Sequence, residues 1–227
     1  MVSESPLWLA SRSTPSDITS SGSRPPASRL DAMRGLWTVT ASLTLMNAAT
    51  MFAWWGLNLW IPAYLSLPPE QGGIGLSTVA MSSFVVAMQV GMWFGYVTFG
   101  FVSDRFGRKP TYIVYLLAAA ALVFAYASVR TPEMLLALGP LVAFFGTGYF
   151  SGFGAITAEI YPTAIRATAQ GFTYNIGRIA SAVAPFVVGR MAQERGFGAA
   201  FTVTAAAFLV AALWWIVIPE TRGRQLA

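Results

Sequence analysis

Long apolar runs separated by short polar turns occupy the chain between residues 35 and 218. Six runs can be delimited, and each has about 20 residues or more, the length at which a helix rising ~1.5 Å per residue spans a ~30 Å hydrocarbon core. The pattern therefore predicts an all-α membrane protein with six transmembrane helices. The predicted spans are residues 35–65, 78–102, 111–129, 134–157, 168–192 and 199–218.

Polar segments flank this apolar region. Residues 1–34 are rich in Ser, Pro and Arg and contain no apolar run, so we expect a mostly flexible cytoplasmic segment. Residues 219–227 are expected to form a short cytoplasmic tail. The predicted domain organisation is thus a cytoplasmic segment, 1–34, a six-helix unit, 35–218, and the tail.

Composition narrows the class further. The chain has 227 residues, of which 56% are hydrophobic and only 10% charged, a balance typical of a polytopic membrane protein. It contains no Cys and no His, and the predicted spans contain no Asp or Glu, so we expect no enzyme, no metal site and no cofactor. The net charge of +5 follows from basic turns and does not indicate nucleic acid as a partner.

The basic residues predict the orientation. Short basic loops stay in the cytoplasm, and placing both termini there leaves ten Lys and Arg side chains inside and three outside. We therefore expect both termini to be cytoplasmic, in a bacterial inner (plasma) membrane. The inside residues are Arg12, Arg24, Arg29, Arg34, Arg105, Arg108, Lys109, Arg166, Arg222 and Arg224; the outside residues are Arg130, Arg190 and Arg195.

The most charged turn, residues 100–110, joins the second and third spans. Spacing alone is equally consistent with a basic turn that only sets the topology. Its sequence, G-x-x-x-D-R-x-G-R-K, resembles the signature loop of the major facilitator superfamily, in which the aspartate faces a helix N-terminus across the interface between two halves. The matching residues are Gly100, Asp104, Arg105, Gly107, Arg108 and Lys109.

Two further charged motifs are predicted at the same membrane face. Residues 159–166 resemble the family's E-[IL]-x-P-T-x-x-R segment, and residues 219–223 resemble the P-E-T-[KR]-G motif of sugar porters. The resemblance implies ion pairs that hold one transport state and break in the other, so we expect a cytoplasmic gate. The alternative is a set of positive-inside anchors without a switching role. Besides the signature loop, the gate residues are Glu159, Arg166, Glu220 and Arg222.

Arg178 is the one ionisable residue placed near the middle of a predicted span. An arginine at that depth needs a partner or a water-filled cavity, and its fork of donors fits a carboxylate. Arg178 therefore either binds an anionic substrate or forms a fixed bridge to a carboxylate or carbonyl of another helix. The other candidate substrate-binding residues, each of which could instead serve helix packing or interface anchoring, are Gln170, Tyr174, Asn175, Asn58, Trp54, Gln89 and Tyr149.

The resemblance covers most of the chain and corresponds to the C-terminal half of such a transporter, built as a 3+3 inverted repeat. Residues 4–9, Glu-Ser-Pro-Leu-Trp-Leu, resemble the pattern that follows the sixth helix in metabolite:proton and sugar-porter branches. The resemblance implies alternating-access, proton-coupled transport of a small organic anion or sugar-like metabolite.

The partners expected from this resemblance are lipid, a small-molecule substrate, protons and a missing N-terminal six-helix half. Three readings stay open. The chain is a C-terminal half whose first half is missing, a half-size carrier that pairs with another six-helix chain, or a non-transporting scaffold or sensor. Because the first half would form the opposing wall of the cavity, we expect no transport by the chain alone.

Overall fold

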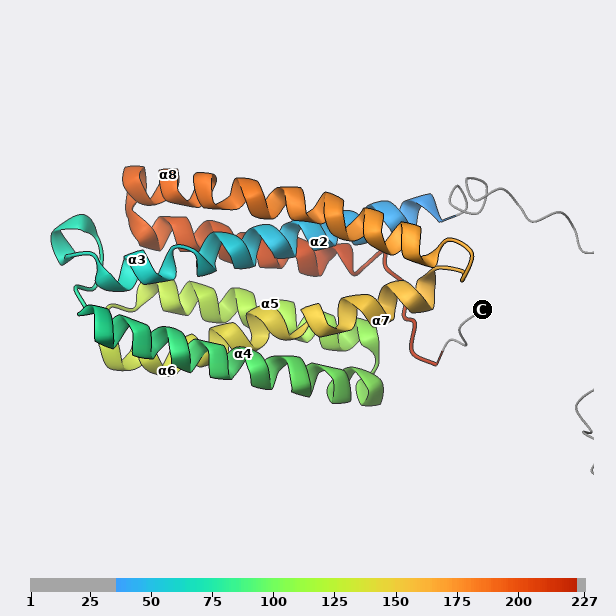
Figure 1. Cartoon of the computed structure of the whole chain (residues 1–227), viewed down its shortest axis with the longest axis horizontal. Helices are drawn as coiled ribbons and strands as arrows, with labels where there is room; N and C mark the ends of the chain where they lie inside the picture. Colours follow the sequence, from blue (N-terminus) through green and yellow to red (C-terminus); the bar gives the residue numbers. More distant parts are fainter. Residues whose placement is uncertain (1–35, 224–227) are drawn as a thin grey trace, which may run out of the picture.

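The computed structural model describes residues 36–223, which form a bundle of helices running along one long axis (Figure 1). No β-strand occurs between these residues. Several expectations fall outside the described part: the motif at residues 4–9, the flexible segment 1–34 with its four arginines, and Arg224. The boundaries proposed for the two flanking segments are therefore still predictions.

The helices follow the apolar runs closely. In chain order they are α2 (Trp37–Asn58), α3 (Ile61–Ser66), the short 3-10 helix η3 (Pro69–Gln71), α4 (Thr78–Phe106), α5 (Arg108–Ser128), α6 (Pro132–Gly148), α7 (Phe150–Ile160) and α8 (Arg166–Trp214). Local chemistry explains several ends. The Ser77 side chain accepts a hydrogen bond from the Ala80 N–H and caps α4, and Pro132 occupies the first turn of α6.

Breaks within the predicted spans are the main difference from the sequence-based expectation. The first span divides into α2 and α3, and the fourth divides into α6 and α7 at Tyr149. The fifth and sixth spans both lie within α8, which consists of two helices that meet at a kink at Gly196, where the φ of 83° is not helical. Hydropathy does not report such breaks, because a break changes backbone angles and not side-chain polarity.

Four helical segments of the described part are long and apolar enough to cross a membrane: Thr78–Phe106, Arg108–Ser128, Pro132–Ile160 and Arg166–Trp214. An all-α membrane fold is thus confirmed, whereas the number of six crossings is still a prediction. α2 is not among the four segments, and its many hydroxyl side chains and Asn47 explain its lower hydropathy.

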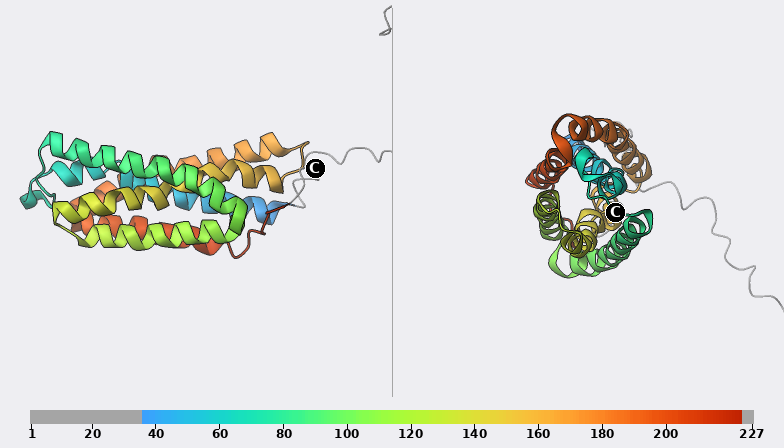
Figure 2. Two further views of the ribbon diagram at one scale, coloured as in Figure 1. Left: turned by 90° about the horizontal axis from the view of Figure 1, so that it is seen from below. Right: turned by 90° about the vertical axis from the view of Figure 1, so that its left-hand side faces the viewer.

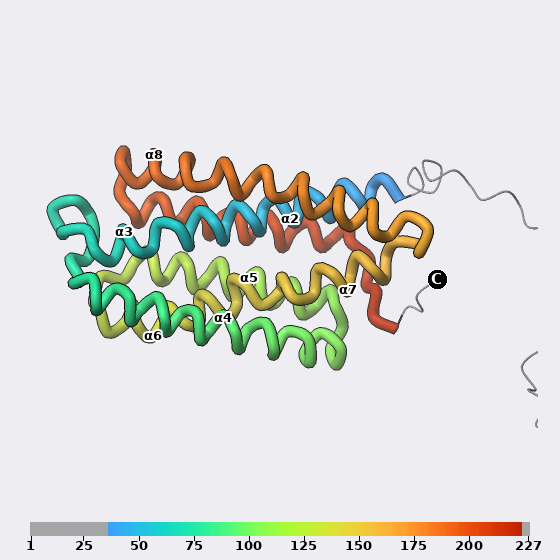
Figure 3. Tube along the Cα trace, viewed as in Figure 1, coloured from blue at the N-terminus to red at the C-terminus, as the bar shows by residue number. Residues whose placement is uncertain are grey.

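The bundle has two distinct ends (Figures 1 and 3). The start of α2, the α4–α5 turn, the α7–α8 turn and the end of the described chain gather at one end, drawn on the right. The loop around η3, the α5–α6 turn and the bend within α8 lie at the other. The predicted cytoplasmic turns therefore do share one end of the molecule. Which side of the membrane that end faces is still a prediction.

Helix neighbours follow a simple arrangement. α2 packs along α8, α4 packs along α6, and α5 contacts both α6 and α8, so the end-on view shows α2 and α8 on one side and α4, α5 and α6 on the other (Figure 2). The α4–α6 contact is very close, since a Cβ added to Gly91 would lie 2.2 Å from the Pro140 carbonyl oxygen. Small residues at such crossings let two backbones approach, as expected for helices in lipid.

Candidate functional site

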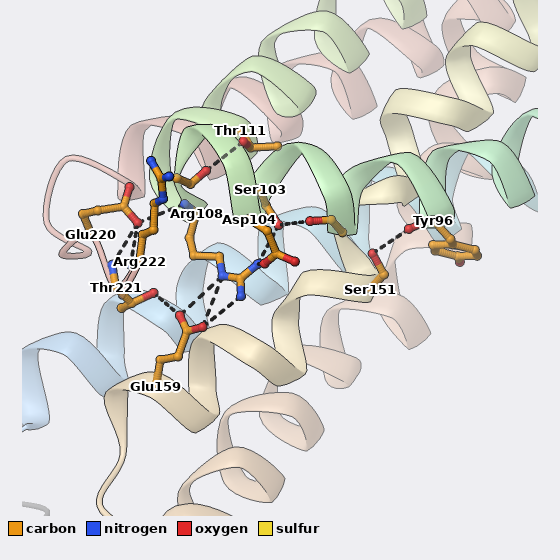
Figure 4. A network of polar contacts seen from close by, with 12 residues as sticks. Tyr96, Ser103, Asp104, Arg108, Thr111, Ser151, Glu159, Glu220, Thr221 and Arg222 are labelled. Carbon is orange, nitrogen blue, oxygen red and sulfur yellow. Dashed lines mark hydrogen bonds and ion pairs between the residues drawn. The ribbon is translucent and has the colours of Figure 1, made fainter. Parts of the chain in front are cut away.

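Arg108 and Glu159 form the centre of a polar network at the charged end of the bundle (Figure 4). Arg108 begins α5 and Glu159 lies near the end of α7. The Arg108 Nη2 lies 2.9 Å from Glu159 Oε1, and its Nε donates to both carboxylate oxygens. The two side chains are only 15% and 14% exposed, so the pair is largely shielded from solvent. Charge-assisted bonds of this forked type are among the stronger hydrogen bonds in proteins.

Three more side chains complete this network. Asp104, one turn before Arg108, lies 2.6 Å from the Arg108 Nη1, and the Ser103 hydroxyl accepts a 2.7 Å bond from the same nitrogen. The Thr221 hydroxyl donates to Glu159 from the C-terminal segment, and Thr221 is fully buried. The network therefore ties together the end of α4, the start of α5, the end of α7 and the segment after α8.

Glu220 caps the N-terminus of α5 from more than one hundred residues away in sequence. Its carboxylate accepts the backbone N–H groups of Arg108 at 2.9 Å and Lys109 at 3.1 Å, and also those of Thr221 and Arg222. Burial acts to raise the pKa of Glu220, but these four backbone donors outweigh it and hold the pKa below its usual value. A carboxylate at this position also interacts favourably with the helix dipole.

Lys109 makes the reverse connection. Its Nζ donates to the carbonyl oxygens of Ile216 and Ile218, just after the end of α8, at 3.3 and 3.1 Å. The first residues of α5 and the chain after α8 are therefore tied in both directions, an acid to N–H groups and an ammonium to C=O groups. Gly107 permits this approach, because a Cβ there would lie 2.8 Å from the Glu220 carboxylate and its φ is 106°.

The remaining predicted gate residues take other positions. Arg105 is exposed and its guanidinium lies 5.9 Å from the Phe106 ring centroid, and Arg166 donates to the Tyr161 carbonyl oxygen. A Cβ added to Gly100 would meet nothing within 4 Å, and the Arg222 backbone N–H donates to Glu220. Sequence reasoning missed Ser103 and Thr221 as partners, although Thr221 lies inside the P-E-T motif. The gating role itself is still a prediction.

A second polar region is a pocket of about 180 Å³ beside the middle of the bundle. Trp54 and Tyr174, both predicted as substrate-binding residues, line it together. Aromatic rings form most of its wall, which suits a flat organic molecule. Trp55, which the sequence also offered as a cavity residue beside Trp54, lines the pocket as well. Sequence reasoning did not assign the other lining residues, Met51, Tyr96 and Phe150, whose only signal was an apolar or aromatic side chain within a predicted span.

Arg178 stands next to this pocket, one turn after Tyr174 on α8. The guanidinium lies 5.9 Å from the centroid of the Tyr174 ring, and the side chain is exposed. Within residues 36–223, no carboxylate forms an ion pair with it. The alternative of a fixed carboxylate bridge therefore has no support in the described part of the chain.

Asn47 holds the pocket wall in place and was not identified from the sequence. It is buried in α2, and its amide nitrogen donates to the carbonyl oxygens of Thr173 and Tyr174, both at 3.3 Å. Gly177 makes room for it, since a Cβ there would lie 2.1 Å from the Asn47 nitrogen. This contact fixes the part of α8 that carries Tyr174 against α2.

The other predicted substrate residues are dispersed. Asn58 and Gln89 line a separate pocket of about 240 Å³ between α2, α3 and α4. Tyr149 is 2% exposed and its ring packs against Tyr112 and Phe208, so it does not line the aromatic pocket. The Asn175 amide donates back to the carbonyl oxygen of Gly171, and Gln170 is half-buried near Gly154.

Comparison with known proteins is consistent with this architecture. Residues 43–227 match the family described as Major Facilitator Superfamily. A Haemophilus influenzae protein assigned to metabolite transport is 31% identical over 83% of this chain and 45% of its own length. The cis,cis-muconate transport protein of Acinetobacter baylyi is 30% identical over 77% of this chain and 40% of its own length.

Solved structures show the same fold. A crystal structure of a POT peptide transporter superposes with a TM-score of 0.67 at 16% identity, covering 78% of this chain and 37% of that protein. The chain spans less than half the length of the curated relatives described above. Because the family match covers most of its length, the chain belongs to the Major Facilitator Superfamily and is a multi-pass integral membrane protein, not an enzyme.

Proposed function

We propose that this chain forms one wall of the solute pathway of a transporter that moves a small organic anion across the membrane by alternating access. The observation that carries the proposal is Arg178, a cation beside an aromatic pocket with no carboxylate partner in the described chain. An unpaired guanidinium at such a depth is costly unless a water-filled cavity or an anion accompanies it.

The chemistry of the pocket favours a flat carboxylic acid. The rings of Trp54 and Tyr174 offer apolar faces, and the Arg178 fork can accept a carboxylate in a bidentate geometry. Relatives are named for cis,cis-muconate, niacin and gentisate, each of which combines a carboxylate with a planar unsaturated skeleton. A neutral sugar carries no negative charge to pair with the Arg178 guanidinium, so we propose an organic anion as the substrate in preference to a sugar-like metabolite.

The proposal extends to a proton and to a second group of helices. Tyr174 and Arg178 are exposed, so a further wall that covers them would enclose the solute. We propose that another six-helix unit supplies that wall and that this chain does not transport without it. No Asp or Glu lines the aromatic pocket within the described part, so a coupling proton is assigned to a site outside that pocket.

Uptake of labelled organic anions tests this function. Cells that express the chain with a six-helix partner unit should accumulate nicotinate, muconate or gentisate above cells with either unit alone. Nicotinamide, which keeps the ring of nicotinate but lacks its charge, is the matched neutral control and should not compete. Equal uptake with and without the chain, or equal competition by nicotinamide, would contradict the proposal.

A further inference from the structure

An apolar groove of about 310 Å³ runs between the last turns of α4 and the first turns of α5. Val102 and Phe106 line one side, and Pro110, Val114 and Tyr115 line much of the other. The groove lies at the charged end of the bundle, because α4 ends at Phe106 and α5 begins at Arg108. Residues 110–115 extend only about 8 Å along α5 at ~1.5 Å per residue, so the groove occupies the depth at which lipid headgroups meet acyl chains.

Its surroundings indicate that this face contacts lipid. Phe106 is 65% exposed and Val114 is 58% exposed, and Leu117 and Phe124 continue the apolar surface along α5. In a membrane-spanning bundle, exposed apolar side chains that no other helix covers face acyl chains and not water. The groove is thus an indentation in a lipid-facing surface, and an acyl chain is the chemistry that fits it.

A cation lies beside one of the residues that line the groove. The guanidinium of Arg105 lies 5.9 Å from the centroid of the Phe106 ring, and Phe106 lines the groove. The neighbouring charges are already engaged, because Asp104 pairs with Arg108 and the Lys109 Nζ donates to the carbonyl oxygens of Ile216 and Ile218. Within residues 36–223, no ion pair joins a carboxylate to Arg105.

We propose that this groove is a binding site for an anionic phospholipid, with one acyl chain between α4 and α5 and the headgroup phosphate held by Arg105. Guanidinium groups bind phosphate oxygens in a bidentate manner, and basic pockets between membrane helices are typical positions for anionic headgroups. The site is separate from the aromatic pocket and does not depend on the transported solute. It assigns Arg105 a role that differs from that of Arg108, which lies three residues away and pairs within the protein.

Native mass spectrometry of the purified chain tests the site, with phosphatidylglycerol and phosphatidylcholine of identical acyl chains as probes. We expect phosphatidylglycerol to be retained more strongly, and Arg105→Gln to weaken its binding about fivefold, the effect of one basic residue near an anionic surface. Arg195→Gln, the same change at an exposed arginine of α8, is the matched control and should change nothing. Equal retention of the two lipids, or an unchanged affinity in Arg105→Gln, overturns the proposal.

A second variant tests the groove without touching the charge. Val114→Trp places a large ring on an exposed position of the groove wall, and we expect it to weaken phosphatidylglycerol binding about tenfold by displacing the acyl chain. Val210→Trp, at an exposed valine of α8, is its control. Dihexanoyl phosphatidylglycerol and inorganic phosphate should bind weakly. Full binding of either short probe, or loss of lipid through dimerisation of the chain, means that the groove does not hold the acyl chain and overturns the proposal.

Discussion

The two arginines Arg108 and Arg178 illustrate the contrast between the two polar regions of this bundle. The Arg108 guanidinium is held by the carboxylates of Asp104 and Glu159 and by the Ser103 hydroxyl, and its side chain is 15% exposed. The Arg178 guanidinium has the ring of Tyr174 beside it and is exposed. Both are arginines on membrane helices, yet only the first has its donors satisfied by carboxylates of the described chain.

This difference indicates two roles for an arginine on a membrane helix: holding helices together and binding a ligand. A cation whose charge is already balanced by acids of the same chain holds helices together, and breaking it leaves partners buried without compensation. A cation that has no such acid can exchange water for a ligand carboxylate at lower cost, because no internal bond must break first. We therefore propose that the charged end provides stability and the predicted gate, and that the solute binds at the aromatic pocket.

Among the variants considered, replacing Arg178 should have the largest effect, and that effect should be on the affinity for the organic anion. In the transporter that contains both walls, Arg178→Gln should weaken the binding of an organic anion by about 30-fold to more than 1,000-fold. Truncating one partner of a desolvated charged pair costs ~2–5 kcal/mol of binding free energy, which corresponds to this range. Arg178→Lys keeps the charge but loses the planar fork, so its effect should be smaller. Isothermal calorimetry measures both. The melting temperature should stay near that of the parent; a large drop with unchanged affinity would assign Arg178 to structure.

Removing the charge of Glu159 should mainly affect stability. Glu159→Gln leaves the Arg108 donors with a weaker acceptor, and we expect the free energy of unfolding to fall by about 2 kcal/mol, a typical value for hydrogen bonds to charged groups. Glu194→Gln is the matched control, because the Arg190–Glu194 pair is 81% and 54% exposed and should contribute about 0–1 kcal/mol. Denaturant titrations of both variants measure the difference. Equal losses would mean that shielding does not distinguish the two pairs.

The wall of the aromatic pocket can be tested with two glycines of α8. Gly177→Ala should destabilise the protein by about 1–3 kcal/mol, since its Cβ would lie 2.1 Å from the Asn47 nitrogen that holds the Tyr174 backbone. Gly171→Ala, six residues earlier with nothing within 4 Å, should instead be neutral or stabilise α8 by up to about 1 kcal/mol. Thermal denaturation reads out both. A loss of stability in Gly171→Ala would show that position to be covered by a further element.

The smallest expected effect is the contribution of Glu220 to the pH dependence of stability. The pKa of Glu220 is lowered in the folded chain, so its stabilising contribution is present above the pKa of an unfolded glutamate and is lost as the pH falls through the folded pKa. Between pH 7 and pH 3, the parent should therefore lose more of its melting temperature than Glu220→Gln, which lacks this titration. If the parent and Glu220→Gln lose the same amount of melting temperature over that range, the Glu220 cap of α5 does not contribute to stability.

The class of the molecule and much of its charged end could be predicted from the order of residues alone. Apolar runs of about 20 residues allow few structures other than membrane helices, because every backbone polar group must be satisfied in lipid. The three charged motifs also indicated which turns share an end of the bundle, and the structure places residues of all three in contact. The apolar runs and the charged motifs are local in the chain, so they can be recognised without knowledge of the tertiary structure.

Which side chains contact one another could not be predicted in this way, because it depends on how the helices pack. Trp54 and Asn58 are four residues apart on α2, yet they line different pockets, because the pockets depend on what α4, α7 and α8 bring to each level of the bundle. Asn47 and Glu220 gained their roles from segments more than one hundred residues distant. Periodicity tells which residues share a helix face, but the partner of that face is set by how helices cross. That is a property of packing, which the order of residues along one helix does not contain.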